Sequence, residues 1–153
     1  LKYFDRAISI NPNHLDALKW RSMLYSQKND FQKSLEDNLK IIAIDSNNSR
    51  AYAAAGEIYG KNLNNIDKSY WYLSKALEKD SANEAALCNM GVVFHIRGDG
   101  EGAFRYFMKA YKINPDNPFT LSNLASYYSL RGDTLKARQF SQKAKQLTDR
   151  KVE

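Results

Sequence analysis

Apolar residues along this chain recur with the period of an α-helix, at positions i, i+3, i+4 and i+7 of successive stretches. Each stretch is about 14 residues long and is followed by a short polar turn. Two stretches with their turns make one unit, and this unit occurs four times at a spacing of 34 or 35 residues. Because repeated helix pairs are typical of solenoids, we expect an all-α solenoid of antiparallel helix pairs, with about nine helices.

The repeat divides the chain into one partial and four complete units. Residues 1–14 have the pattern of a second helix alone. Complete units are expected at 15–48, 49–83, 84–117 and 118–151, and the second of these has one extra residue. Since the same pattern runs through all of them, we expect a single array rather than two domains.

The two ends of the expected array differ in polarity. Leu1, Phe4 and Ile8 form an apolar stripe with no preceding helix to cover it, which predicts that the natural protein continues upstream. In the last unit, polar residues stand where earlier units have apolar ones, at Arg138, Ser141 and Lys145. A polar outer face is typical of a terminal repeat, so we expect the array to end near Lys151.

The same residue types return at fixed places within the units. In each first helix a large residue is followed by a small one and then an aromatic: Leu18, Ser22 and Tyr25; Tyr52, Gly56 and Tyr59; Leu87, Gly91 and Phe94; Leu121, Ala125 and Tyr128. Small residues let two helices approach closely, while large ones fill the space between units. This pattern resembles the tetratricopeptide repeat family, and the resemblance covers nearly the whole chain.

The resemblance implies a right-handed superhelix with a concave surface that binds a peptide or helix of a partner protein. First-helix residues that do not pack on the second helix would line this surface. By position these are Lys19, Trp20, Met23, Arg50, Ala53, Glu57, Ala85, Cys88, Asn89, Val92, Ile96, Phe119 and Asn123. Apolar members such as Trp20, Val92 and Phe119 favour a peptide with apolar anchors.

Two ligand-binding modes of the family can be compared with these positions. Asn89 and Asn123 are equivalent, and an asparagine ladder holds the peptide backbone in some members, including O-linked glycosyltransferases; Trp20 and Ala54 interrupt the ladder here. The carboxylate clamp of heat-shock co-chaperones needs lysine, asparagine and arginine at set places that this sequence does not fill. We therefore expect no clamp of that type.

Arg21 stands where the pattern calls for a buried aliphatic residue. Asp37 lies where the second helix of the same unit should pass beside it. Because an unpaired buried arginine costs several kcal/mol, we expect an Arg21–Asp37 ion pair. The alternative is an arginine that reaches solvent along its alkyl stem.

Candidate chemistry is sparse. His14 and His95 are too few and too far apart for a metal site, and no Ser-His-Asp or Cys-His set stands out. The glycine-rich segment 98–102 lacks the Lys-Ser/Thr of a phosphate loop and the oxygen ligands of a calcium loop, so we interpret it as a turn between helices. We expect no enzyme activity, no metal and no cofactor.

Charge and hydropathy limit the partners further. The net charge of +6 is shared evenly between the two halves, which argues against a nucleic-acid face, and no stretch is apolar enough to span a membrane. The lone Cys88 favours the cytoplasm, although a cysteine-poor periplasmic protein would look the same.

The sequence therefore predicts a non-catalytic interaction module. Two alternatives stay open at this point. In the first alternative, the array is the targeting arm of a larger enzyme, such as a glycosyltransferase, whose catalytic domain lies outside this sequence. In the second, the apolar stripe at Leu1, Phe4 and Ile8 pairs with a second copy of the chain.

Overall fold

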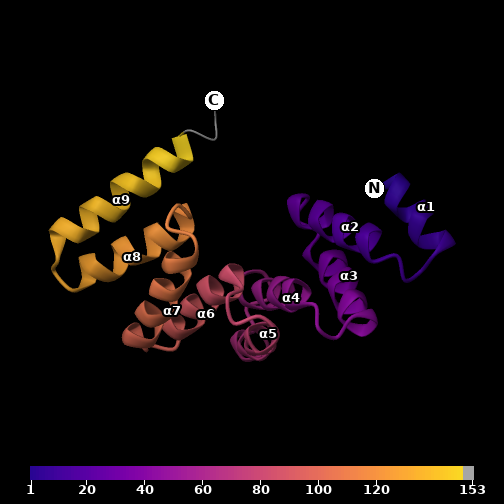
Figure 1. The fold of residues 1–153 in the computed structure, drawn as a ribbon, viewed down its shortest axis with the longest axis horizontal. Helices are drawn as coiled ribbons and strands as arrows, with labels where there is room; N and C mark the ends of the chain where they lie inside the picture. Colours follow the sequence, from indigo (N-terminus) through magenta and orange to yellow (C-terminus); the bar gives the residue numbers. More distant parts are fainter. Residues whose placement is uncertain (150–153) are drawn as a thin grey trace. The chain divides into compact units, whose positions relative to one another are not determined.

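The computed structural model describes residues 1–149, and within that range the chain is all-α (Figure 1). Its elements are α1 (Lys2–Ile10), α2 (Leu15–Gln27), α3 (Phe31–Ile44), α4 (Ser49–Lys61), α5 (Ile66–Lys79), α6 (Glu84–Ile96), α7 (Gly100–Ile113), α8 (Pro118–Leu130) and α9 (Thr134–Asp149). This confirms the predicted fold of paired helices. The last expected unit ends at Lys151, which lies outside the described residues.

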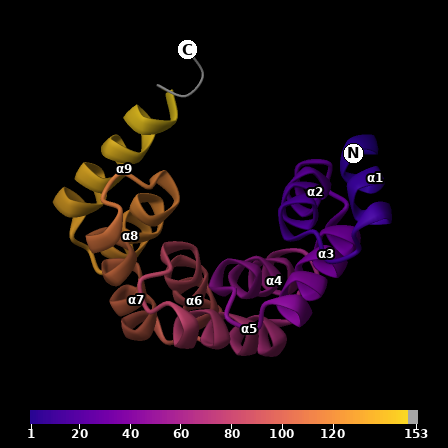
Figure 2. The ribbon, with the colours of Figure 1, turned by 45° about the vertical axis from the view of Figure 1, so that its right-hand side comes forward.

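The chain forms two compact units, one from Leu1 to Ala86 and the other from Leu87 onward. In the first unit α2 pairs with α3 and α4 pairs with α5, while α3 also packs against α4 (Figure 2). In the second unit α8 pairs with α9 and also packs against α7. That the four copies make one array stays a prediction.

Polar side chains cap the helices at repeat spacing. The first helix of each copy is capped by His14, Asn48, Asn83 or Asn117, whose side chains accept from a backbone N–H of the first turn. The second helix is capped in the same way by Asp30, Asn65, Asp99 or Asp133. Each cap satisfies a backbone donor that has no partner inside its helix. The caps therefore fix the residue at which each helix begins.

Small residues bring the helices of a pair close together, as the pattern predicts. A Cβ atom built on Gly56 would lie 2.7 Å from Leu73 Cγ, and one on Gly91 would lie 2.5 Å from Phe107 Cε1. No side chain fits at these distances without displacing its neighbour. Leu73 and Phe107 therefore pack directly on the backbone of α4 and α6 and are almost fully buried.

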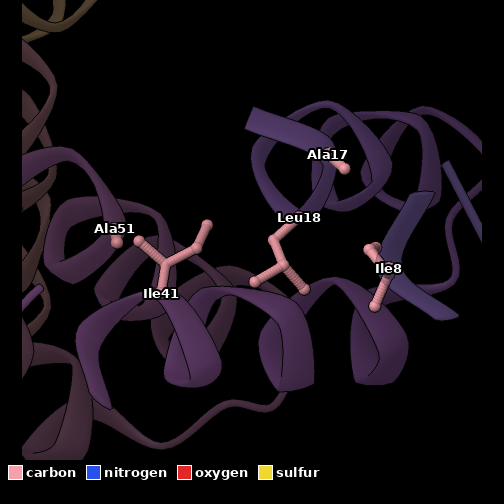
Figure 3. Packing of buried hydrophobic residues seen from close by; sticks show 5 residues of the cluster. All are labelled: Ile8, Ala17, Leu18, Ile41 and Ala51. Carbon is pink, nitrogen blue, oxygen red and sulfur yellow. The ribbon is translucent and has the colours of Figure 1, made fainter. Parts of the chain in front are cut away.

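The core of the first unit begins with α1. Ile8, Leu18 and Ile41 pack together with Ala17 and Ala51, so this cluster joins α1, α2, α3 and α4 (Figure 3). Phe4 is half-buried against the same cluster. Two residues of the expected stripe, Ile8 and Phe4, thus pack within the chain, because α1 packs on α2.

The core of the second unit is rich in aromatic residues. Phe107 and Leu124 are buried together with Ala103. Around them the rings of Tyr128 and Phe140 stack at 5.6 Å, and those of Phe104 and Tyr127 stack at 4.3 Å. These rings tie α7, α8 and α9 together.

Candidate functional site

A pocket of about 360 Å³ opens in the first unit, among α2, α3 and α4. Its lining comes from Leu15, Asp16, Lys19, Ser22 and Met23 on α2, from Asn38 and Ile41 on α3, and from Asn48, Arg50, Ala51 and Ala54 at the start of α4. Three of the residues expected from the sequence, Lys19, Met23 and Arg50, therefore share one concavity. The volume is at the lower end of the range for ligand pockets.

One residue of the pocket wall departs from the repeat pattern. Leu73 and Phe107 fill the space beside Gly56 and Gly91 in the second and third copies. The equivalent position in the first copy is Asn38, and it lies with Ser22 in the pocket wall. Asparagine has the length of leucine but a smaller volume and a polar tip, so the first copy has an amide at this point of the pocket wall.

Asn38 is 5% exposed, yet only part of its amide is hydrogen-bonded. Its Nδ2 donates to the Ser34 carbonyl oxygen at 2.8 Å, which fixes the nitrogen on that side. Within residues 1–149, no group donates to Asn38 Oδ1, and this atom belongs to a side chain of the pocket wall. Because no buried side-chain oxygen of the described residues lacks a partner, Oδ1 is open to solvent, and a ligand donor in the pocket could bind it.

The rim of the pocket carries more positive than negative charge. Lys19 and Arg50 are exposed, and in the described part of the chain neither has a carboxylate partner. The Lys19 ammonium lies 5.3 Å from the ring centroid of Trp20, which is 48% exposed. Asp16 is the one acidic side chain in the lining.

Close to this pocket, the structure brings Arg21 and Asp37 together. Arg21 Nε donates to Asp37 Oδ2 at 2.8 Å, and Arg21 Nη2 donates to Asp37 Oδ1 at 2.6 Å. This pair and a further bond to Asp5 hold the pKa of the Arg21 guanidinium well above its usual range, against the opposing effect of burial. The pairing has the geometry that the sequence reasoning expects, with a bidentate contact between a fork of donors and a carboxylate.

Asp5 is a third partner in this ion pair that the sequence does not predict. Its Oδ1 accepts a hydrogen bond from Arg21 Nη1 at 2.9 Å. The positions equivalent to Asp5 in later copies are uncharged, at Leu39, Ser74 and Met108. Comparison between copies therefore offers no signal for this contact.

The remaining predicted groove residues fall into two groups. Exposed or half-buried ones are Trp20, Met23, Glu57, Ala85, Val92, Ile96, Phe119 and Asn123. Ala53, Cys88 and Asn89 are buried instead. Cys88 Sγ lies 2.7 Å from Thr120 Oγ1, so this side chain is used in packing α6 on α8.

The two asparagines of the expected ladder differ in exposure. Asn89 is 7% exposed. Asn123 is more exposed, and its Nδ2 donates to the Phe119 carbonyl oxygen of its own helix at 2.8 Å. That these amides hold a peptide backbone stays a prediction.

The second unit has a broader hollow of about 540 Å³ between α8 and α9, with His95 at its edge. Ala125 and Ser141 lie in its wall. These are the fourth-copy equivalents of Gly91 and Phe107. Here the small Ser141 stands where the third copy has Phe107. The exposed side chains Ile96 and Leu130 belong to the same unit.

Within 1–149, no three His, Cys, Asp or Glu residues are grouped so that they would hold a metal ion. None of the helices in that range combines the length and hydrophobicity needed to cross a membrane.

Comparison with solved structures shows the same fold elsewhere. PilW, described as a widely conserved type IV pilus biogenesis factor, superposes with a TM-score of 0.79 and 21% identity, over 95% of this chain and 67% of its own. A thermophilic tetratricopeptide repeat protein from Thermus thermophilus gives a TM-score of 0.79 and 19% identity, over 97% of this chain and 81% of its own. MamA gives a TM-score of 0.74 and 17% identity, over 97% and 86%.

Comparison of the sequence gives a family but no curated relative. No curated protein matches at a significant level. Family models described as tetratricopeptide repeat match residues 84–117 and, in a second form of the repeat, residues 106–139. These matches identify tetratricopeptide repeat sequence in residues 84–139, and together with the helix pairs and the small residues at their contacts they support a tetratricopeptide repeat assignment for the chain.

Proposed function

We propose that this chain is a non-catalytic interaction module that binds a peptide segment or a helix of a partner protein. The proposal rests on one observation above all, the preformed pocket among α2, α3 and α4. Interfaces are held mainly by a few apolar or aromatic anchors that enter such pockets. The pocket offers apolar walls for an anchor and polar groups for its surroundings.

Exposed apolar side chains on first helices support the same role. Trp20 and Met23 are 48% and 44% exposed on α2, and in the second unit Ile96 and Phe119 are 55% and 39% exposed. Large apolar side chains left in water are costly, and they are typical of surfaces that become covered on binding.

A display selection tests this function. A random library of 12-residue peptides is selected on the chain, and the affinity of enriched peptides is measured by fluorescence anisotropy. Two variants probe the first helices: Met23→Glu in the first unit and Phe119→Glu in the second. We expect at least one of them to weaken binding by tenfold or more, while helicity and Tm change little.

Matched controls carry the same charge at exposed apolar positions elsewhere. Tyr3→Glu on α1 and Leu135→Glu on α9 alter side chains that are 88% and 68% exposed. Both should bind as the unchanged chain does. If no peptide is enriched, or if the controls lose binding while the two variants keep it, the proposed surface is wrong.

A further inference from the structure

The pocket of the first unit differs from its surroundings in a way that specifies a ligand. In the next two copies, Leu73 and Phe107 fill the space beside their glycines, and nothing in either side chain needs a polar partner. In the first copy Asn38 stands at this position and places an amide in the wall of a pocket of about 360 Å³. One position thus supplies a hydrogen-bonding group where the next two copies have none.

The polar group in this wall is an acceptor. Asn38 Nδ2 is committed to the Ser34 carbonyl oxygen at 2.8 Å, and that carbonyl can only accept. The side chain therefore cannot be turned over without losing this bond. Oδ1, which accepts no hydrogen bond from the described residues, requires a donor from whatever fills the pocket.

The other walls restrict the ligand to an apolar body. Ile41 and Ala51 belong to the core cluster (Figure 3). They are 4% and 3% exposed and line the pocket, so they form a fixed, apolar side of it. Met23 at the mouth is flexible and polarizable, and it packs well against aromatic rings. An apolar side chain with a donor at its tip fits these walls better than a charged one does.

The rim adds a preference for negative charge beside the anchor. Lys19 and Arg50 lie on opposite helices of the pocket and have no carboxylate partner among residues 1–149, against a single acidic residue, Asp16. An acidic residue next to the anchor would find a cation within reach of the rim.

We propose that this pocket is an anchor subsite for an aromatic side chain that carries an O–H or N–H donor, tyrosine or tryptophan, in a partner peptide with an acidic residue beside it. The donor binds Asn38 Oδ1, the ring lies against Ile41, Ala51 and Met23, and the acidic residue meets Lys19 or Arg50. This assignment rests on the proposed function, since it names the chemistry of the peptide that the module binds.

Two substitutions at Asn38 test the acceptor. Asn38→Leu restores the residue of the next copy, which is bulkier and has no polar group, so binding of a tyrosine or tryptophan peptide should fall by at least tenfold. Asn38→Ala removes the acceptor without adding bulk to the pocket wall. With this variant, a tyrosine peptide and its phenylalanine analogue should bind equally, whereas the unchanged chain should prefer tyrosine about fivefold.

The peptides come from the display library, selected on the unchanged chain with Asn38→Leu as counter-selection. We expect enrichment of Tyr or Trp with Asp or Glu within three residues. Lys19→Gln and Arg50→Gln should each weaken an enriched peptide about twofold to fivefold, and the effect should disappear at high salt. Equal binding of the tyrosine and phenylalanine peptides to the unchanged chain would overturn the assignment.

The failure of this inference is distinguishable from that of the proposed function. Peptides that depend on Phe119 but bind Asn38→Leu normally would overturn the anchor subsite and leave the interaction module standing. A selection with no enriched peptide would overturn both. If light scattering shows a dimer that Asn38→Leu converts to a monomer, the occupant is a second copy of the chain and the partner peptide is excluded.

Discussion

Arg21 joins three helices through one guanidinium group. It lies on α2, contacts Asp37 on α3 and also bonds Asp5 on α1. The side chain of Asp37 is 5% exposed and that of Asp5 is 50% exposed, so the two ion pairs lie in different dielectric surroundings. A buried charge depends strongly on its partner, whereas an exposed pair contributes little.

Removing the buried partner should therefore destabilise the chain more than removing the exposed one. We expect Asp37→Asn to lower the free energy of unfolding by about 2 kcal/mol, because Arg21 then keeps its charge without a bidentate acceptor. Asp5→Asn, the control, should cost less than about 1 kcal/mol. Urea unfolding measures the free energy of unfolding of both variants. Equal decreases would contradict the expectation that the buried carboxylate contributes more stability than the exposed one.

Gly91 gives a second test at the level of one residue. Its missing side chain admits Phe107, so Gly91→Ala should force the ring aside and lower stability by about 1–3 kcal/mol. Gly100→Ala is the matched control, since a Cβ there meets nothing within 4 Å. Combining Gly91→Ala with Phe107→Leu should recover part of the loss; if it does not, the clash is not with the ring.

At the scale of the helices, a regular series of caps fixes where each element starts. Asp30 and Asp133 cap α3 and α9, and each also pairs with a lysine one turn ahead, Lys33 or Lys136. The bond from Lys33 lowers the pKa of Asp30, and the backbone bond from Lys136 lowers the pKa of Asp133. Both carboxylates are thus held ionised in the folded chain.

The lowered pKa values of Asp30 and Asp133 determine how the stability of the folded chain changes in acid. A carboxyl group whose pKa is lower in the folded chain contributes stability above its unfolded pKa, about 3.9, and loses it as the pH falls through the folded value. We expect the starts of α3 and α9 to fray below about pH 4. The amide hydrogen-exchange rates of Lys33 and Lys136 report this; Asp30→Asn, which keeps a capping oxygen, should remove the response in α3 alone.

At the scale of the whole molecule, each helix pair depends on its neighbours and not on distant parts. Solenoid stability is a sum of local terms, so a local change should have a local effect. Asp37→Asn should speed hydrogen exchange in α2 and α3, while Gly91→Ala should do so in α6 and α7. Uniform acceleration along the chain in either variant would indicate a single cooperative unit.

Much of this arrangement follows from repeat spacing alone. The spacing of Gly56 and Gly91 predicts close helix contacts, and Arg21 in an apolar position predicts its aspartate partner. The burial of Cys88 does not follow in this way, because it depends on how near α8 comes, as the contact with Thr120 shows. The pocket escapes the pattern as well, since its walls come from three helices and the asparagine at position 38 alone does not indicate a cavity.

A pocket within the first unit makes ligand binding and folding thermodynamically linked. A ligand side chain buried there would add apolar burial to the folded state, about 1.5–3 kcal/mol for a fully buried one. A ligand that binds only the folded chain raises its stability in proportion to the logarithm of ligand concentration. The copy made of α2 and α3 is then the part of the chain whose order responds to supply of its partner.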